Sequence, residues 1–350
     1  MAASDASLSL SSKPTPKQEH DHEPEKDNLS LLLHKYKDKL TTLPKQKGWM
    51  GENLYMYQGF WYGSTSAFSV QTTMAMQDSF KPLPTDIYLL TLPKSGTTWV
   101  KALMFATVNR TTYNHNSNTS VLTHPLFVSN PHNCVPFIEP EFVNKTPTYV
   151  QENPNPNPRL FSTHIPYTSL PRSILDSGCR LVYLCRNPKD VMVSWYYFSN
   201  KFTLKNLSPM TIDEMFEVFV KGTVPYGPYW DHVKEYYNAS CEHPTKILFL
   251  TYEVMKKDTV NQVKRIAEFL GCPFSKEEET EGCVEEIMRL CSLEVLKEVN
   301  KDGEYSEGVP NAVFFREGKV GGWREDLTDE MSKTLDDITN EKFQDLGILF

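Results

Sequence analysis

The stretch "LTLPKSGTTWVKAL", residues 90–103, connects an apolar strand to a helix and decides how the rest of the chain is interpreted. The run before it, 86–92, is apolar, and the run after it, 97–110, has helical spacing. A standard P-loop requires a glycine, four residues and then Gly-Lys-Ser/Thr. Here Lys94 precedes Gly96, and no second glycine opens the loop. The stretch therefore predicts an anion-binding turn that differs from the usual nucleoside triphosphate loop.

The residue types in this turn explain how it would bind an anion. A helix N-terminus presents unpaired N–H groups and a partial positive charge. Lys94 adds a full positive charge, and Gly96 lets the backbone approach a ligand closely. Thr97 and Thr98 offer hydroxyl groups, and the flat face of Trp99 is suited to stacking on an aromatic base. The alternative is an ordinary strand–loop–helix connection.

Composition limits the classes of partner. The chain has 350 residues with 36 Lys and Arg against 44 Asp and Glu, a net charge of −8, which argues against nucleic acid as the main partner. No stretch approaches the roughly 20 apolar residues of a membrane span, and the start of the chain lacks the apolar segment of a signal peptide. The seven cysteines are scattered without a C-x-x-C pair, which favours reduced thiols and a cytoplasmic protein.

The distribution of apolar residues predicts the fold. Residues 1–27 are rich in Ser, Pro, Lys and Glu and are predicted to be a disordered tail, and residues 28–350 a single domain. Four short apolar runs predict buried parallel strands at 86–92, 159–164, 180–185 and 246–251. Helical runs are expected at 29–40, 97–110, 189–203, 211–221, 227–239 and 259–270. This alternation predicts an α/β protein with a three-layer, P-loop-like fold, in which helices flank a central parallel sheet. The Pro- and Asn-rich segments 130–142 and 151–160 are predicted to be loops near the site or on the surface.

Each predicted strand ends near a residue whose side chain could bind a ligand or take part in catalysis. Ligands of such sheets bind at the carboxyl ends of the strands. The arginine fork of Arg186 suits a phosphate, and the hydroxyl of Ser194 could complete its shell. Tyr252 follows the fourth strand, and His164 ends the second. A histidine has a pKa near ~6.5 and is suited to remove a proton at neutral pH.

Two motifs in this set resemble those of the cytosolic sulfotransferases. These enzymes move a sulfonate from 3′-phosphoadenosine 5′-phosphosulfate (PAPS) to a hydroxyl or an amine. "PKSGTTW" (93–99) resembles their 5′-phosphosulfate loop, so Ser95 joins the residues expected to bind PAPS. "YLCRNPKDVMVSWYYF" (183–198) resembles their 3′-phosphate motif, with Arg186 and Ser194 in the matching places.

The C-terminal signature is matched less completely. "FFREGKVGGW" (314–323) resembles the segment in which the family's Arg-Lys-Gly contacts the same 3′-phosphate. Arg316 and Gly318 match, but Glu317 stands where the family usually has lysine. Lys319 could compensate for this change, or the 3′-phosphate could be held more weakly.

The resemblance also implies the roles of other residues. "FSTHIPY" (161–167) is similar to the family's Thr-His-x-Pro motif, which makes His164 the catalytic base. Lys94 would then meet the bridging oxygen of the donor and the leaving phosphate. Further nucleotide contacts are implied for Tyr252, Ser292 and Leu293.

The similarity covers most of residues 40–348 and looks closest to plant flavonol and hydroxyjasmonate sulfotransferases, through runs such as "LPKQKGW" (43–49) and "YQGFW" (57–61). It implies PAPS as co-substrate, no required metal, and a small hydrophobic hydroxylated acceptor. The acceptor pocket is expected to draw on Phe60, Trp61, Phe137 and Tyr229.

Two other functions stay open at this stage. One is a P-loop-type kinase with a degenerate loop, which would require ATP and magnesium. The other is a non-catalytic nucleotide-binding relative. The dimer motif of animal relatives is not visible near the C-terminus, so a monomer or a weak homodimer is expected.

Overall fold

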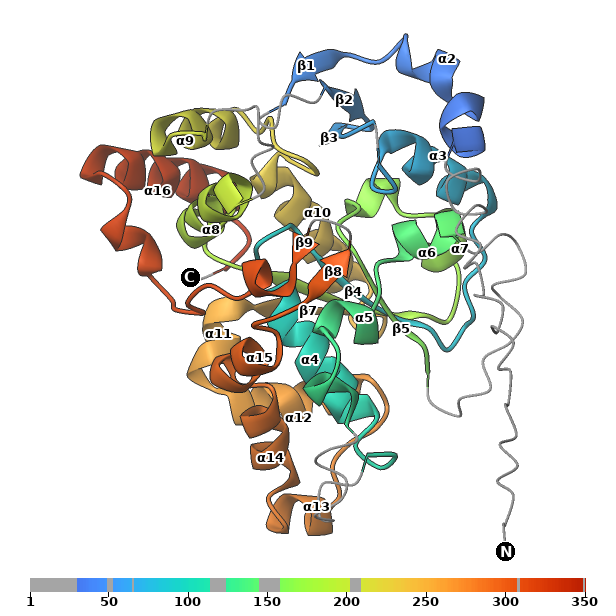
Figure 1. Ribbon diagram of the computed structural model, residues 1–350, viewed down its shortest axis with the longest axis vertical. Helices are drawn as coiled ribbons and strands as arrows, with labels where there is room; N and C mark the ends of the chain where they lie inside the picture. Colours follow the sequence, from blue (N-terminus) through green and yellow to red (C-terminus); the bar gives the residue numbers. More distant parts are fainter. Residues whose placement is uncertain are drawn as a thin grey trace, which may run out of the picture.

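A four-stranded parallel sheet forms the centre of the molecule (Figure 1). The computed structural model describes residues 30–48, 53–64, 66–113, 124–144, 158–201, 209–306, 309–348 and 350. The strands lie in the order β5 (Leu160–Thr163), β4 (Ile87–Thr91), β6 (Arg180–Cys185) and β7 (Ile247–Thr251). The four predicted strands are therefore confirmed to within one or two residues at each end. The predicted tail, 1–27, lies outside the described residues.

The apolar runs are uninterrupted because both faces of the sheet are covered. Every residue of β4 is buried. Successive side chains of a strand point to opposite faces, and here Tyr88 and Leu90 enter one hydrophobic cluster while Ile87 and Leu89 enter another. The predicted three-layer arrangement is confirmed.

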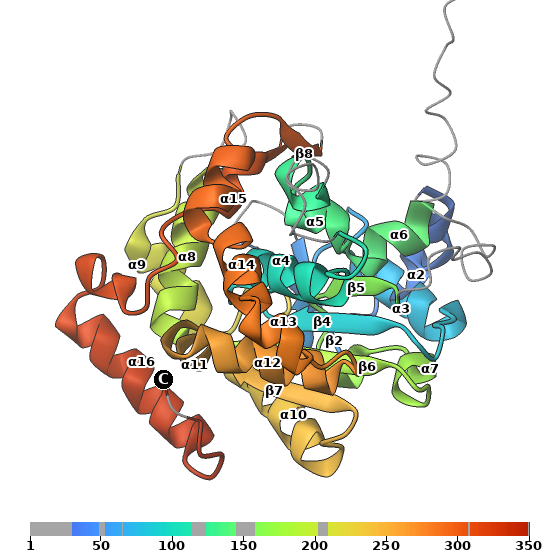
Figure 2. The same ribbon diagram turned by 90° about the horizontal axis from the view of Figure 1, so that it is seen from below.

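Helices form the two outer layers, with α4 and α10 on opposite sides of the sheet (Figure 2). The layer on the Leu89 side contains α4 (Thr97–Val108), α12 (Thr259–Phe269) and α14 (Cys283–Leu290). The layer on the Leu90 side contains α3 (Val70–Ser79), α8 (Pro188–Lys201), α10 (Tyr229–Glu242) and α16 (Asp329–Phe343). The helices predicted at 97–110, 189–203, 227–239 and 259–270 correspond to α4, α8, α10 and α12.

Smaller elements surround this centre. A three-stranded antiparallel sheet, β1 (Lys45–Lys47), β2 (Asn53–Tyr57) and β3 (Phe60–Tyr62), lies at the top of Figure 1. The other short elements are α2 (Lys37–Leu40), α7 (Arg172–Leu175), α9 (Ile212–Val220), α11 (Tyr252–Lys257), α13 (Lys276–Thr280), α15 (Leu293–Val299), β8 (Glu304–Ser306) and β9 (Val309–Pro310). The helices predicted at 29–40 and 211–221 correspond to residues 30–35 with α2 and to α9.

The prediction of a loop over residues 130–142 was wrong. This segment contains α5 (Pro131–Cys134) and α6 (Ile138–Asn144). The side chain of Asn130 accepts a hydrogen bond of 3.0 Å from the backbone N–H of His132 and so caps α5. The prolines do not prevent these helices because Pro131 and Pro140 lie in first turns, where N–H groups have no intrahelical partner. Residues 151–157 of the second predicted loop lie outside the described part of the chain.

All seven cysteines are free, as the sequence predicts. In the part of the chain that the structure describes, no helix is both long enough and apolar enough to cross a membrane.

Candidate active site

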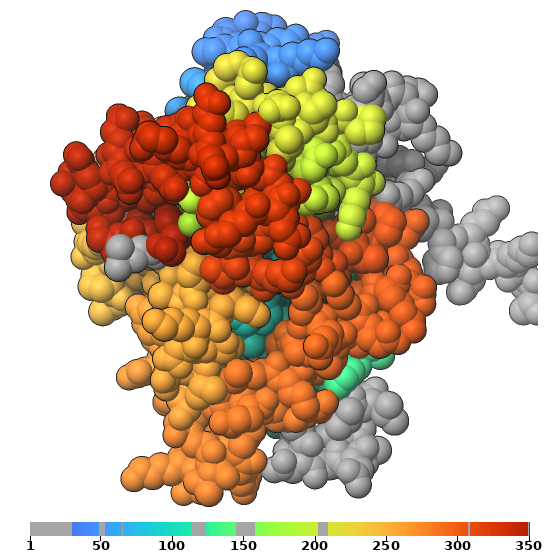
Figure 3. Space-filling view, turned by 90° about the vertical axis from the view of Figure 1, so that its left-hand side faces the viewer, coloured from blue at the N-terminus to red at the C-terminus, as the bar shows by residue number. Residues whose placement is uncertain are grey.

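A cavity of about 920 Å³ lies at the carboxyl ends of the four central strands. One residue that follows each strand lines it: Lys94 after β4, His164 after β5, Arg186 after β6 and Tyr252 after β7. The other predicted site residues that line it are Gly96, Thr97, Thr98, Trp99, Ser194, Ser292, Leu293, Arg316 and Gly318. Ser95 and Glu317 lie beside it but are not among its described lining residues. In Figure 3, orange and red segments of the last third of the chain border a hollow in which the teal segment of α4 is visible.

The loop between β4 and α4 has an unusual backbone. Lys94 has φ of 71° and Gly96 has φ of 109°, both in the region that favours glycine. A Cβ atom on Gly96 would lie 2.6 Å from Cδ2 of Tyr252. Trp99 meets the same tyrosine edge-on, with ring centroids 5.5 Å apart. Only glycine therefore allows the loop to pack against Tyr252.

Lys94 is surrounded by other cations. Its Nζ lies 3.8 Å from the centroid of the Phe198 ring. Burial and, in decreasing order, the positive charges of Lys201, Arg186 and Arg316 together lower the pKa of Lys94 to about 7. An anion bound among these groups would stabilise the protonated form.

His164 is held in one orientation by the end of β4. Its Nδ1 lies 2.7 Å from the carbonyl oxygen of Thr91 and donates a hydrogen bond to it. The Oγ1 of Thr91 lies 3.1 Å from the same nitrogen and 2.7 Å from Oγ1 of Thr97. Because Nδ1 carries the proton, Nε2 holds the lone pair. Burial lowers the pKa of His164 to about 3, so the imidazole is neutral and able to accept a proton.

Arg186 presents an unsatisfied donor near the cavity. It is buried, and its Nη2 donates to the carbonyl oxygen of Lys319 at 2.6 Å. Its guanidinium lies over the Tyr252 ring, 4.4 Å from the centroid. The Nε of Arg186 and the Oγ of Ser95 are buried and have no hydrogen-bond partner among the described residues. Buried donors of this kind are usually satisfied, and a bound anion would satisfy them.

The C-terminal segment is fixed against the site by side chains of α8 and α11. The Tyr252 hydroxyl donates to the carbonyl oxygen of Gly318 at 2.9 Å. The buried carboxylate of Asp190 accepts hydrogen bonds from the backbone N–H groups of Gly321 at 2.8 Å and Trp323 at 3.2 Å. Asp190 lies four residues after Arg186, a spacing that is visible in the sequence.

Glu317 forms ion pairs on both sides. Its Oε2 lies 3.9 Å from Nη1 of Arg316 and 3.8 Å from Nζ of Lys319. Lys319 is mostly exposed, and it also lies 3.9 Å from Glu325. Lys319 therefore offsets the charge of Glu317 only in part, and Glu317 partly neutralises the positive charge of Arg316.

The predicted acceptor wall is only partly correct. Phe137 lines the cavity, but Phe60, Trp61 and Tyr229 do not. Phe60 and Tyr229 pack in the hydrophobic cluster on the Leu90 side, and Trp61 is also buried. The hydroxyl of Tyr229 donates to the carbonyl oxygen of Arg186 instead. The aromatic wall is formed by Phe68, Phe137, Phe198, Tyr226, Tyr305 and Phe314.

His132 is a site residue that the sequence reasoning missed. It is buried, lines the cavity, and its Nε2 lies 3.0 Å from Oγ1 of Thr98. Its Nδ1 lies 2.9 Å from Nζ of the fully buried Lys101. The sequence contained one signal for it: His132 follows Asn-Pro in the Pro- and Asn-rich segment 130–142, which is predicted to lie near the site or on the surface.

The charge of the cavity is strongly positive. Five of the described lining residues are cationic: Lys94, Arg186, Lys201, Lys256 and Arg316. Glu294 is the acidic one. Among the described residues there is no group of three or more His, Cys, Asp or Glu side chains placed to hold a metal ion. The arrangement suits an anionic ligand with several charges.

Comparison with known proteins gives consistent results. Residues 84–347 match the family model described as "Sulfotransferase domain". The chain is 44% identical over 313 residues to Cytosolic sulfotransferase 12 of Arabidopsis thaliana, covering 89% of this chain and 92% of that protein. It is 42% identical over 328 residues to Cytosolic sulfotransferase 11 of the same plant, covering 93% and 90%.

Solved structures also resemble the fold. A "putative steroid sulphotransferase" of Arabidopsis thaliana matches with a TM-score of 0.70 and 37% identity, over 96% of this chain and all 100% of that one. A mouse sulfotransferase in complex with 3′-phosphoadenosine 5′-phosphate (PAP) matches with a TM-score of 0.61 and 26% identity, over 83% of this chain and 94% of that one.

Proposed function

The chain belongs to the sulfotransferase family, and on this premise we propose that it transfers a sulfonate from PAPS to a hydroxyl group of a small hydrophobic acceptor of the flavonol or hydroxyjasmonate type. The observation that carries the proposal is the position of Lys94 and the neutral His164 in one cavity with the cationic Arg186 and Arg316. The names of the plant relatives, "Cytosolic sulfotransferase", support a cytoplasmic location.

The residues present fit a donor that is phosphorylated at both ends. We assign the loop from Lys94 to Thr98 to the 5′-phosphosulfate, because its helix N-terminus, lysine and hydroxyls suit an anion. Arg186, Ser194 and Arg316 are assigned to the 3′-phosphate, and the partnerless Nε of Arg186 supports this. Trp99 and Tyr252, with Gly318, Ser292 and Leu293, are assigned to the adenosine.

Proton transfer is assigned to His164. As the acceptor oxygen forms its bond to sulfur, its proton moves to Nε2 of His164. The imidazolium that results is stabilised because Nδ1–H already donates to the carbonyl oxygen of Thr91. The burial that keeps His164 neutral in the free protein is offset when an anionic donor occupies the cavity.

Stabilisation of the leaving group is assigned to the loop from Lys94 to Thr98. The bond between sulfur and the bridging phosphate oxygen breaks, and negative charge accumulates on that oxygen. Lys94 supplies a positive charge there, and the hydroxyls of Thr97 and Thr98 supply hydrogen bonds. The hydrogen bond between Thr98 and His132 orients the Thr98 hydroxyl before a ligand binds.

The remaining proposals concern the whole chain. We propose that residues 28–350 act as one catalytic unit, supported by a hydrophobic cluster that includes both Tyr36 and Leu346. A monomer or a weak homodimer stays a prediction.

Two alternative functions are separated from sulfonate transfer by ligand binding. A kinase would bind ATP, and a non-catalytic relative would bind 3′-phosphoadenosine 5′-phosphate (PAP) without turnover. Calorimetric titration with PAP and ATP, together with a PAPS assay, separates the three.

The decisive experiment replaces the base. We expect His164→Ala to reduce sulfonate transfer from radiolabelled PAPS by about 10²-fold to 10⁴-fold, the usual contribution of a general base. PAP affinity, measured by calorimetry, is expected to change little because His164 is not assigned to the nucleotide. His243→Ala, at an exposed histidine that follows α10, is the matched control and should retain full activity. Activity of His164→Ala close to that of the wild type would refute the assignment.

A further inference from the structure

Lys201 is a cavity-lining cation that the reaction described above does not use. It is the last residue of α8, and its side chain lines the same cavity as Lys94 and His164. No salt bridge joins it to a carboxylate among the described residues, whereas Lys189 of the same helix is paired with Asp336 at 2.7 Å. Lys201 therefore offers a positive charge to whatever occupies its part of the cavity.

Helix α8 places Lys201 relative to the reaction. Ser194, Phe198 and Lys201 stand four and seven residues apart and so lie on one face, and all three line the cavity. With a rise of about 1.5 Å per residue, Lys201 lies roughly 10 Å along the helix from Ser194. Ser194 is assigned to the 3′-phosphate, and Phe198 lies under Lys94 at the reaction centre. Lys201 thus lies on the far side of Phe198 from Ser194, close enough to Lys94 to lower its pKa more than Arg186 or Arg316 does.

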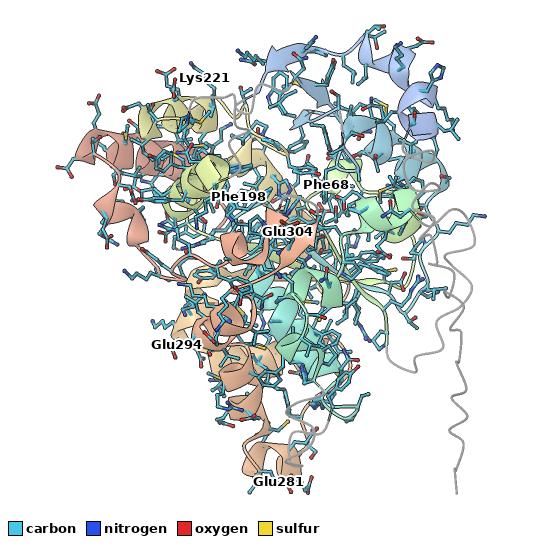
Figure 4. The ribbon with its side chains drawn as sticks, viewed as in Figure 1. Phe68, Phe198, Lys221, Glu281, Glu294 and Glu304 are labelled. Atoms are coloured by element: carbon cyan, nitrogen blue, oxygen red, sulfur yellow. The ribbon has the colours of Figure 1, made fainter. Side chains whose placement is uncertain are left out.

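The acidic lining residue is remote from this end. Glu294 belongs to α15 and follows Ser292 and Leu293, which are assigned to the adenosine. In Figure 4, Glu294 is well separated from Phe198 and Phe68. Nothing acidic among the described lining residues therefore balances Lys201, and the walls near it are aromatic.

The other cations of the cavity are assigned to the donor. Lys94, Arg186 and Arg316 face its two charged groups, and Lys256 lies 5.2 Å from the centroid of the Trp99 ring, where the base is assigned. Lys201, which stands next to Lys94 and has no assigned partner, is then available to the acceptor. This step rests on the proposed sulfonate transfer.

We propose that the acceptor is an amphipathic hydroxy acid, whose carboxylate pairs with Lys201 while its hydroxyl group faces His164. The aromatic wall receives the apolar part of such a molecule. A neutral hydroxylated compound of the same shape leaves the charge of Lys201 unpaired and is a poorer substrate.

The test compares matched pairs of acceptors. Phloretic acid, p-coumaric acid and hydroxyjasmonic acid are each assayed with PAPS against their methyl esters, and the ratio of kcat/KM for acid over ester is measured. We expect the wild type to prefer the acid of its best pair by about fivefold or more, which is what one partly exposed ion pair supplies. Lys201→Gln should reduce the ratio to about one, whereas Lys201→Arg should preserve the preference.

Lys256→Gln is the matched control, because it removes a lysine from the nucleotide end of the same cavity. It should raise the KM for PAPS and leave the ratio of acid to ester unchanged. A wild-type preference for the esters, turnover of no acid while PAP still binds, or a Lys201→Gln variant that keeps the preference for acids would each overturn the proposal. A Lys201→Gln variant that weakens PAP binding without changing the ratio would assign Lys201 to the donor instead. Failure of PAP binding and of all sulfonate transfer would instead contradict the proposed function.

Discussion

Lys94 owes its chemical properties to its neighbours rather than to its own residue type. An exposed lysine has a pKa near ~10.4, but burial and the adjacent cations lower the pKa of Lys94 to about 7. Near neutral pH the free protein therefore contains both protonated and neutral Lys94. Anions bind better to the protonated form, so above pH 7 the binding of an anion is coupled to protonation of the amine.

The affinity for PAP is accordingly expected to fall with rising pH. Between pH 7.5 and 8.5 the dissociation constant of the wild type should increase by up to about tenfold, because each unit above the free pKa removes about nine-tenths of the protonated form. Phosphate groups are already ionised in this range. Lys94→Arg should show a nearly flat profile, since arginine stays charged. The same slope in both proteins, measured by calorimetry, would contradict the lowered pKa.

The loop between β4 and α4 packs closely against Tyr252, the first residue of α11. Gly96 has a positive φ, and its α-carbon faces the Tyr252 ring at a distance that leaves no space for a methyl group. Gly59, in the turn between β2 and β3, has a φ of 88° but no atom within 4 Å of a built Cβ. The two glycines therefore separate the cost of the backbone angle from the cost of the contact.

Alanine at both positions tests this distinction. Gly59→Ala should lower the free energy of unfolding by about 1–2 kcal/mol, the cost of a side chain in the left-handed region. Gly96→Ala should lower it by about 1–3 kcal/mol more, because the methyl group displaces Tyr252, and should also weaken PAP binding severely. Urea denaturation and calorimetry measure the two effects. Equal destabilisation by both variants would show that the contact with Tyr252 is unimportant.

In the whole molecule, the cavity unites segments that are far apart in the sequence. Its described lining runs from Ser66 to Gly318 and includes residues that follow all four central strands. A ligand that contacts Lys94, Arg186, Tyr252 and Arg316 together therefore opposes unfolding of the sheet, α8 and the C-terminal segment at once. A ligand that binds the folded state alone stabilises it by mass action.

PAP is therefore expected to raise the melting temperature. At a concentration of one hundred times its Kd, it should add about 2.7 kcal/mol and raise Tm by roughly 4 °C. ATP at the same concentration should produce little change. Arg186→Ala should lose most of the shift, whereas Arg172→Ala, at a largely exposed arginine, should keep it. An equal shift with ATP in differential scanning fluorimetry would favour the kinase alternative.

Local sequence patterns predicted most of the central fold. The four strands were identifiable because both faces of a parallel sheet are buried, which makes each strand continuously apolar. The segment 130–142 was misjudged because prolines in the first turn of a helix resemble the prolines of a loop. The acceptor wall was misjudged because an aromatic residue such as Phe60 can face either a core or a cavity, and composition does not distinguish them.

The sequence by itself determined the central elements, the loop that is proposed to bind an anion, and the candidate residues Lys94, His164, Arg186 and Tyr252, because these follow from short-range patterns and from strand ends. The tertiary structure alone decided which distant groups meet. Contacts between His132 and Thr98 and between Asp190 and the segment around Gly321 depend on how helices pack on the sheet, and so does the position of Lys201 in the cavity. Burial, and with it the pKa of Lys94 and of His164, arises from that packing and from no local sequence signal.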